Sequence, residues 1–392
     1  MTSEWHEVPL RELVGYISKG IAPSYAEEAS ETTIRVLNQK CNRNFRISYG
    51  DSRLHDTLKK KVPPERYVKP DDILINSTGA GTAGRIAQIE DVSSATTIDG
   101  HMTLIRSNGK VTQKFLGYAL KAHQWEVLQL DEGSTGQTEL NRDRLLDEIM
   151  INYPVSFDEQ NAIVCTLESI DRKLIVNEQL NDNLQQQADA LFSSLYDRSN
   201  TEVRFTDLIQ ILGGGTPKTG ENTYWNGNIA FFTPKDVGTP YTLITEKTIS
   251  KEGLSHCNSR LYPVNTVFVT ARGTVGKVGM SGVPMAMNQS CYALVGKETH
   301  QLLVYFYTLK AVDRLKHKAS GAVFDAITTR DFESEQIMKL SDDDATAFLR
   351  VAEPMFQEVL NNNIENLRLS TLRDSLLPKL MSSEIDVSAV QL

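Results

Sequence analysis

Two short segments of the chain each place a threonine hydroxyl, two glycines and a basic side chain directly after an apolar run. They are Gly81-Thr82-Ala83-Gly84-Arg85 and Gly273-Thr274-Val275-Gly276-Lys277. Exposed backbone N–H groups, a hydroxyl and a cation are the groups that grip a phosphate. The same spacing also suits a plain tight turn, which needs glycine for its positive φ angles. We therefore expect two turns, with Thr82, Arg85, Thr274 and Lys277 as candidate phosphate ligands.

The motifs of common enzymes are missing from the sequence. There is no GxxxxGK[ST] loop and no Asn/Asp-Pro-Pro-aromatic tetrad of an amino-methyltransferase. The only carboxylate two residues before a lysine is in Asp171-Arg172-Lys173, which we expect to be a solvated helix face. The histidines are scattered and the cysteines fall singly, so we expect no metal site and no cofactor in this chain. A stand-alone enzyme is therefore disfavoured.

The length of 392 residues suits two domains with connecting elements. No apolar run approaches the roughly 18 residues that span a bilayer, so we expect no membrane contact. The first residues lack the basic start and apolar stretch of a secretion signal. We expect a cytoplasmic protein with reduced thiols.

The segments around the two turns recur in the same order along the chain, which indicates an internal duplication. Residues 34–40 match 229–235 at an offset of 195, and the turns match at 192. Further on, Arg142-Asp143 matches Arg330-Asp331 at an offset of 188. Several short matches with a slowly drifting offset are typical of two copies of one unit that differ in loop length.

A long polar helix is expected after each copy. Residues 155–200 contain no glycine or proline. Their apolar residues alternate three and four apart, as in a coiled-coil seam, at Ile163, Leu167, Ile170, Leu174, Leu184, Ala188, Leu191 and Leu195. At the centre, either the seam shifts to Leu180, or Asn177 and Asn181 are buried and set the register.

The second helix is expected over roughly Asp344 to Met381. Its apolar stripe consists of Phe356, Val359, Leu360, Ile364, Leu367, Leu372, Leu376 and Leu380. Neither helix has a face wide enough to stand alone, so we expect the two to pack on each other. A helix of about 30–35 residues is a rod of roughly 45–50 Å, which is suited to be a spacer.

The expected domains are 1–154 and 201–340, and the expected helical segments are 155–200 and 341–392. The net charge of −9 is not spread evenly over them. Each helical segment has five more acidic than basic residues, whereas the two globular segments together have one more basic than acidic residue. The globular segments are therefore free to bind a polyanion.

Taken together, these motifs resemble the specificity subunit of type I restriction-modification systems, over nearly the whole chain. The resemblance rests on Pro70-Asp71-Asp72-Ile73-Leu74, on the two glycine turns, and on Ser134-Thr135-Gly136 and Ser320-Gly321 before a helical segment. Gly215-Thr216-Pro217 and Asn288-Gln289-Ser290 follow the family's commoner spelling. The first half departs from it with Asp99-Gly100-His101, and this departure puts the recognised sequence in doubt more than the family.

The resemblance implies an α+β fold: two mixed α/β target-recognition domains, separated by an antiparallel two-helix coiled coil in a pseudo-twofold arrangement. It implies a non-catalytic bacterial or archaeal subunit that binds double-stranded DNA and two methyltransferase subunits, with room for two restriction/translocase subunits. Those partners would use S-adenosylmethionine, ATP and Mg. We assign partner binding to the helices that carry Leu167, Ile170, Leu174, Leu184, Leu191, Phe356, Leu360, Ile364, Leu367 and Leu376.

For DNA contact we select basic and aromatic side chains in the loops that differ between the copies. They are Lys40, Arg43 and Arg46 in the first half and Lys218, Tyr224, Trp225, Lys235 and Arg272 in the second. Two alternatives stay open: the target-recognition subunit of a type IIB-like restriction-methylation enzyme, and a coiled-coil adaptor that binds only proteins.

Overall fold

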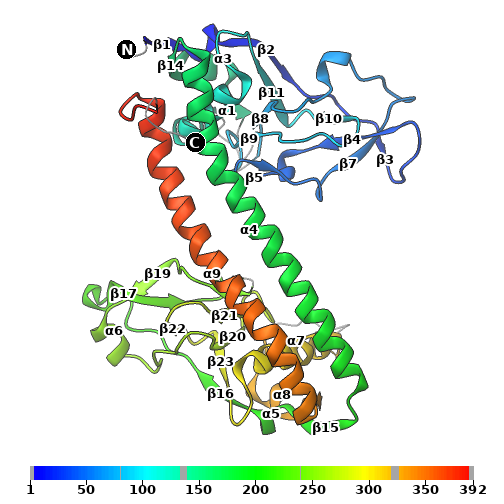
Figure 1. Cartoon of the computed structure of the whole chain (residues 1–392), viewed down its shortest axis with the longest axis vertical. Helices are drawn as coiled ribbons and strands as arrows, with labels where there is room; N and C mark the ends of the chain where they lie inside the picture. Colours follow the sequence, from blue (N-terminus) through cyan, green and yellow to red (C-terminus); the bar gives the residue numbers. More distant parts are fainter. Residues whose placement is uncertain (1–3, 80, 133–138, 239, 319–325, 388–392) are drawn as a thin grey trace. The chain divides into compact units, whose positions relative to one another are not determined.

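The computed structural model describes residues 4–79, 81–132, 139–238, 240–318 and 326–387. The chain forms two compact units, of which the first comprises Met1–Arg172 and Ser370–Leu392 and the second Lys173–Leu369. Each unit contains one globular domain and a part of both long helices, α4 (Phe157–Arg198) and α9 (Asp342–Met381) (Figure 1). The two units are described separately below.

The first unit contains two main β-sheets and three short helices. Its elements are β1 (Trp5–Pro9), β2 (Val14–Lys19), β3 (Tyr25–Ala26), β4 (Thr33–Leu37), β5 (Asn42–Arg43), β6 (Arg46–Ile47), β7 (Arg53–Asp56), β8 (Ile73–Asn76), β9 (Ile86–Gln88), β10 (Thr96–Ile98), β11 (Met102–Ser107), α1 (Gln113–Ala122), α2 (Gln124–Val127), β12 (Asp131–Glu132), β13 (Glu139–Leu140), α3 (Arg142–Glu148) and β14 (Met150–Pro154). One sheet has the order β2-β11-β8-β9 and the other β10-β4-β7-β3. Strand β8 is buried along its whole length, which explains its continuous apolar run.

The core of the first unit lies between its main sheet and the helices. Helix α1 begins at the cap Thr112, whose hydroxyl accepts a hydrogen bond from Phe115 N at 3.2 Å. Its buried face packs with Leu167 of α4 and Leu380 of α9 in one cluster. The apolar stripes of both long helices are thus part of a domain core, and this burial stabilises the helices.

The second unit repeats this architecture. Its elements are β15 (Thr201–Arg204), α5 (Phe205–Leu208), β16 (Ile209–Gly213), β17 (Trp225–Phe232), β18 (Tyr241–Thr242), β19 (Lys247–Ile249), α6 (Lys251–Ser255), β20 (Val267–Thr270), β21 (Val278–Ser281), β22 (Met285–Met287), β23 (Cys291–Gly296), α7 (Gln301–Lys318), α8 (Thr329–Ser334) and β24 (Gln336–Lys339). The sheets have the orders β16-β23-β20-β21-β18 and β19-β17-β22. Aromatic rings of α4, α7 and α9 contribute to the core, where the Phe306 ring contacts those of Phe192, Phe348 and Phe356.

The strand pairings confirm the duplication. Antiparallel order β2-β11-β8-β9 in the first unit corresponds to β16-β23-β20-β21 in the second. The parallel pair β4–β10 corresponds to β17–β22, and the antiparallel pair β1–β14 corresponds to β15–β24. The mixed α/β fold of both domains is therefore confirmed.

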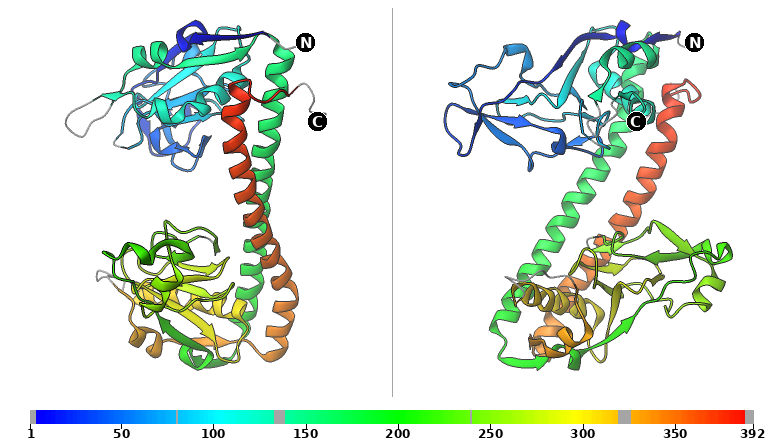
Figure 2. Two further views of the ribbon diagram at one scale, coloured as in Figure 1. Left: turned by 90° about the vertical axis from the view of Figure 1, so that its left-hand side faces the viewer. Right: turned by 180° about the vertical axis from the view of Figure 1, so that it is seen from behind.

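In the second unit the two long helices run antiparallel and side by side (Figure 2). Asn177 bonds to Asn366 at 2.8 Å, and Asn181 bonds to Asn362 at 2.9 Å, so that the residue numbers rise along α4 as they fall along α9. Asn177 is 1 % exposed, whereas Leu180 is 40 % exposed. The prediction of buried asparagines is confirmed, and the alternative seam through Leu180 is wrong.

Two expectations about the helices are corrected by the structure. Asp171 does not lie on a solvated face, because it pairs with Lys121 of α1 at 3.1 Å and with Arg373 of α9 at 3.0 Å. Leu367 and Leu372 of the expected stripe are 37 % and 47 % exposed and are not buried. Around Leu367, asparagines take the positions that face α4. In both cases the exposure of a helix face depends on which elements pack against it. Helical periodicity does not encode this.

Candidate nucleic-acid interface

In the first domain, three connections meet at one end of the sheets. The connection between β10 and β11 lies beside the end of β4, because Asp99 N donates a hydrogen bond to Leu37 O at 2.9 Å. It also borders the end of β8, where Ser77 N donates to His101 O at 2.7 Å. A Cβ on Gly20 would come within 2.2 Å of Asp99 O, so glycine is required where the connection after β2 crosses this point.

The second domain builds the same junction from different residues. Asn288 N donates to Phe232 O at 2.9 Å, and Ala271 N donates to Ser290 O at 2.8 Å. A Cβ on Gly214 would come within 2.1 Å of Asn288 O. The loops that the sequence singled out in the two halves are therefore equivalent in space.

Asp99 of the first domain makes the same turn as Asn288, the residue at the equivalent position of the second domain. His101 N donates to Asp99 Oδ1 at 2.9 Å, and Ser290 N donates to Asn288 Oδ1 at 3.0 Å. Burial raises the pKa of Asp99, and the hydrogen bond from His101 N and the charge of Arg53 offset this only in part. Asp99 thus replaces the amide as a turn-forming acceptor in the same fold position.

The glycine turns follow β8 and β20, as expected. Gly81 and Gly84 have φ angles of 68° and 83°, and Gly273 and Gly276 have 83° and 74°. In the first turn the N–H groups of residues 82–85 all donate to carbonyls of the turn or of Asn76, as in a plain tight turn, so these groups are not free for a phosphate. The first turn is therefore a structural frame, in which a phosphate would meet side chains. In the second turn, Gly276 N donates to Thr270 O at 2.8 Å and Lys277 N donates to Thr270 Oγ1 at 2.9 Å.

Those side chains take different positions. Thr82 Oγ1 donates to Gly79 O at 3.3 Å, and Thr274 Oγ1 donates to Pro234 O at 3.2 Å. Arg85 is exposed, although one of its N–H groups donates to Gly81 O at 3.1 Å. Lys277 is exposed. The cations remain available, whereas the two hydroxyl protons are used within the fold.

The structure brings Lys40 and Lys235 to the glycine turns. Each lies three residues beyond the end of its strand, β4 or β17, and both are exposed. The residue before each lysine contacts the turn: Thr78 Oγ1 donates to Gln39 Oε1 at 3.5 Å, and Thr274 Oγ1 donates to Pro234 O at 3.2 Å. Lys235 also pairs loosely with Glu246 at 3.7 Å. The two lysines are equivalent residues of the two copies.

Arg43 and Arg46 lie on the hairpin β5–β6, which has no counterpart among the described strands of the second domain. Asn42 anchors this hairpin by donating to Arg85 O at 2.8 Å. Arg43 is exposed and pairs with Asp51 at 3.5 Å, and Arg46 is half-buried. The hairpin therefore brings two more cations next to the first glycine turn.

The aromatic candidates in the second domain are largely engaged within the fold. The Tyr224 ring stacks on His256 with centroids 4.9 Å apart, and the Trp225 ring packs edge-on against Phe231. Trp225 Nε1 also donates to Lys218 O at 3.2 Å, which fixes the loop that carries the exposed Lys218. The Trp225 side chain thus positions the backbone of Lys218, whereas the Tyr224 ring packs on His256.

The remaining candidate, Arg272, is exposed beside the second glycine turn, and its neighbourhood contains a cation that the sequence analysis missed. A Cβ on Gly276 would lie 2.6 Å from Lys316 Cε, so the end of α7 covers this turn. In the first domain α2 covers the equivalent turn, with Gln124 Nε2 donating to Gly84 O at 2.8 Å, and exposes Trp125 by 74 %. The sequence feature that could have indicated Lys316 is the basic run Lys316-His317-Lys318 at the end of α7.

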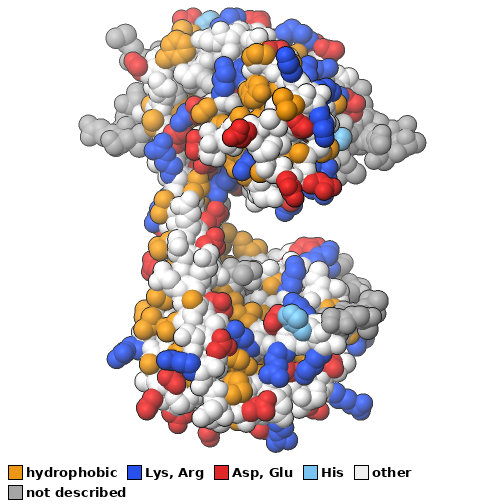
Figure 3. Space-filling model, turned by 90° about the vertical axis from the view of Figure 1, so that its right-hand side faces the viewer, with side chains coloured by type: hydrophobic (Ala, Val, Ile, Leu, Met, Phe, Trp, Pro, Cys, Tyr) orange, Lys and Arg blue, Asp and Glu red, His pale blue; other side chains and the backbone are white. Residues whose placement is uncertain are grey.

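On the face that Figure 3 shows, basic side chains are dispersed and not gathered into one stripe. Figure 3 shows Lys and Arg side chains among acidic and uncharged ones on one face of each unit. Among the described residues there is no group of three His, Cys, Asp or Glu side chains that could hold a metal ion. No described helix is long and apolar enough to cross a membrane. The expected Ser134-Thr135-Gly136 and Ser320-Gly321 segments lie outside the described residues.

Comparison with known proteins places this geometry in a family. The chain is 28 % identical over 186 residues to the HindI specificity subunit of a type I restriction enzyme from Haemophilus influenzae, over 46 % of this chain and 40 % of that subunit. It is 29 % identical over 127 residues to the MjaIX specificity subunit from Methanocaldococcus jannaschii, over 31 % of this chain and 29 % of that one. The alignments thus span less than half the length of either relative.

A solved structure shares the fold. The S subunit of a type I restriction-modification system from M. genitalium superposes with a TM-score of 0.62, over 97 % of this chain and 96 % of that one, at 14 % identity. The family model described as the type I restriction modification DNA specificity domain matches twice, at residues 2–186 and 198–339. Because these two matches cover most of the chain, the protein belongs to the type I restriction-modification DNA specificity domain family.

Proposed function

We propose that this chain is the DNA-recognition subunit of a type I restriction-modification complex. Each globular domain reads one half of a bipartite double-stranded DNA target. The paired helices set the spacing between the half-sites and dock two methyltransferase subunits. The chain itself is non-catalytic and cytoplasmic.

One observation carries this proposal: the two domains keep the same junction of loops but change the side chains around it. Lys40 and Lys235 are retained at equivalent positions beside the glycine turns. The surrounding residues differ, with the Arg43 and Arg46 hairpin in one domain and Lys316 in the other. Shared cations suit phosphate contacts that position a domain, and changed side chains suit contacts with different bases.

The chemistry is assigned to partners. Two methyltransferase subunits would supply S-adenosylmethionine-dependent methylation, and two restriction/translocase subunits would supply ATP- and Mg-dependent cleavage. The acidic helical segments, each with an excess of five carboxylates, favour protein partners over DNA on those surfaces.

The test is methylome sequencing of the host with and without this chain. We expect one bipartite adenine-methylation motif to disappear on deletion and to return on complementation. Loss of no such motif would contradict the proposal. A protein-only adaptor would instead leave the methylome unchanged.

A further inference from the structure

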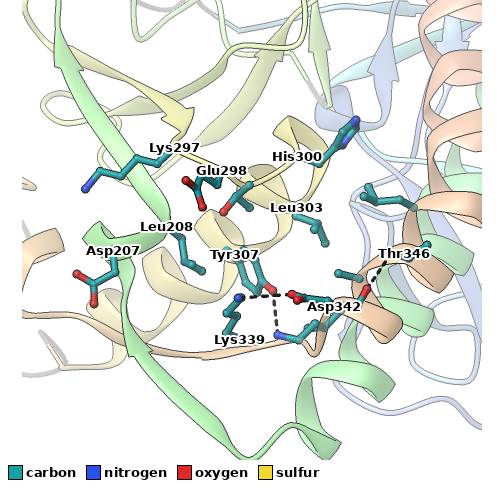
Figure 4. Close-up of a pocket in the computed structure, with 14 residues that line it drawn as sticks. Asp207, Leu208, Lys297, Glu298, His300, Leu303, Tyr307, Lys339, Asp342 and Thr346 are labelled. Atoms are coloured by element: carbon teal, nitrogen blue, oxygen red, sulfur yellow. Dashed lines mark hydrogen bonds and ion pairs between the residues drawn. The ribbon is translucent and has the colours of Figure 1, made fainter.

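A cavity of about 770 Å³ opens in the second unit, where α5, the start of α7, the end of β24 and the first turns of α9 meet (Figure 4). Leu208, Leu303 and Leu349 contribute apolar lining. Charged side chains of both signs surround the opening, namely Asp207, Lys297, Glu298, Lys339 and Asp342. The cavity thus combines an apolar interior with a rim that has no dominant charge.

The duplication gives this cavity an equivalent location in the first unit. Lys297 N donates to Leu208 O at 3.0 Å, just as Asn108 N donates to Leu13 O at 2.8 Å. Gln301 at the start of α7 bonds its amide to Leu294 O at 2.7 Å, and Gln113 at the start of α1 bonds to Ile105 O at 3.1 Å. The walls of the two locations are therefore the same pieces of the fold.

In the first unit this location is filled by the side chain of Gln160, which is completely buried. Its Oε1 accepts a hydrogen bond from Thr112 N, at the start of α1, at 2.8 Å. Its Nε2 donates to Pro154 O, at the end of β14, at 2.9 Å. One carboxamide thus satisfies a donor and an acceptor of the backbone, and Val111 fills the adjoining space with 1 % exposure.

The second unit has Ala345 in place of Gln160. Each residue lies four positions after a capping serine, since Gln160 N donates to Ser156 O at 3.1 Å and Ala345 N donates to Ser341 O at 2.8 Å. Alanine lacks the carboxamide, and Thr299 stands where the first unit has the buried valine. The smaller and more polar side chains leave the cavity open.

The backbone groups that Gln160 satisfies also have equivalents. They are the N–H of His300, at the start of α7, and the carbonyl of Leu340, which follows β24. Within the described part of the chain, neither group has a hydrogen-bonding partner. Leu340 is buried and His300 is exposed. The cavity therefore offers an acceptor in its interior, where backbone groups normally find a partner, and a donor at its edge, the two groups whose equivalents hold a carboxamide in the other copy.

We propose that this cavity is a docking site for a second polypeptide, which inserts the carboxamide of a Gln or Asn side chain between His300 N and Leu340 O. The cavity is larger than one side chain, so it admits the peptide segment that carries the amide. The rim, with cations and carboxylates in near balance, suits an uncharged segment. The first unit has no vacancy for such a partner, because Gln160 occupies it.

The test uses the full-length chain and two short peptides in saturation-transfer NMR. The probes are acetyl-Gly-Gln-Gly-N-methylamide and the same peptide with norleucine in place of glutamine, so that the glutamine side chain carries the only primary carboxamide. We expect transfer from wild type to the glutamine peptide and an affinity about tenfold lower for the norleucine peptide. A345Q should abolish the transfer by filling the cavity, whereas A347Q, at an exposed alanine of the same helix, should leave it unchanged.

Each other outcome overturns the proposal. Equal transfer to both peptides, transfer that persists in A345Q, or no transfer from wild type at millimolar peptide would exclude a carboxamide site. Binding of free propionamide as strong as that of the peptide would assign the cavity to a small molecule. A lower melting temperature for A345Q than for A347Q would show that the cavity does not accept the amide. None of these results depends on DNA binding.

Discussion

Asp171 shows how one side chain joins three elements of the first unit. Its carboxylate accepts a hydrogen bond from Tyr118 at 2.9 Å and pairs with Lys121 and Arg373. Burial alone would raise the pKa of Asp171, but the two cations and the tyrosine outweigh burial and lower it. Burial lowers the pKa of Lys121 in spite of the carboxylate. The cluster therefore holds α1 against both long helices through mutually dependent charges.

Replacing Asp171 with Asn should lower the free energy of unfolding by about 3 kcal/mol, because it leaves the largely buried Lys121 without its paired carboxylate and leaves Arg373 paired only with Asp374. Denaturant unfolding of D171N at neutral pH measures this loss. D182N, at an exposed position of the same helix, is the matched control and should stay within about 0.5 kcal/mol of wild type. Equal stability of the two variants would contradict the role of the cluster.

The same residue predicts a pH dependence. Its pKa in the folded chain lies below the ordinary value of 3.8. The stability that it contributes is therefore fully present above about pH 4 and is lost as the pH falls through the folded pKa. The difference in stability between wild type and D171N should shrink only in this acid range, which unfolding curves at a series of pH values would show.

Lys40 and Lys235 should contribute equally to DNA affinity without reading sequence. K40Q and K235Q should each weaken binding and reduce the slope of log affinity against log salt by about 0.9, the value for one phosphate contact. Fluorescence anisotropy at several salt concentrations, with a DNA duplex that carries the bipartite motif found by methylome sequencing, gives these slopes. K69Q and K251Q, at exposed lysines elsewhere in each domain, should keep the wild-type slope.

At the scale of elements, the helix pair is held together by apolar layers that are interrupted by amides. Asn181 both accepts from Asn362 and donates to Asn363, each at 2.9 Å. Such a layer contributes less stability than leucine but can be satisfied in only one register. We infer that the amide layer selects the pairing of α4 with α9.

Replacing Asn181 with Leu should cost about 1–3 kcal/mol, because it leaves buried amides of α9 unsatisfied. Replacing Asn362 as well should recover part of that loss, so that a double-mutant cycle gives a coupling energy. N183L, at an exposed asparagine of α4, is the control. Simple additivity of N181L and N362L would contradict a shared layer.

The sequence predicted elements better than contacts. The duplication and the glycine turns were predictable because each depends on local periodicity or on a backbone angle that only glycine adopts readily. Periodicity narrowed the centre of the helix to two alternatives, and the buried asparagines were one of them. The environments of Asp171, Lys316 and Trp225 were not, since they depend on which segment distant in sequence packs against them. Whether the N–H groups of the glycine turns are free for a phosphate stayed open in the sequence, because a repeated glycine motif does not reveal where its donors point.

At the scale of the whole molecule, the proposed spacing role can be tested with a matched deletion. Removing residues 178–184 and 359–365 together preserves the pairing of Asn177 with Asn366, because the two segments face each other in the antiparallel register. Seven residues of helix correspond to about 10 Å, or roughly three base pairs. Methylome sequencing should show a gap shortened by about that amount, whereas an unchanged gap in an active complex would contradict the spacing role.

The first and last strands of each domain pair with each other, β1 with β14 and β15 with β24. The chain therefore enters and leaves each domain at neighbouring points, Trp5 opposite Pro154 and Thr201 opposite Lys339. A domain connected in this way is exchangeable: recombination that keeps the terminal strand pair replaces everything between them without altering the helix that follows. On the proposed function, exchange of whole modules between genes would change the target preference and leave the scaffold intact.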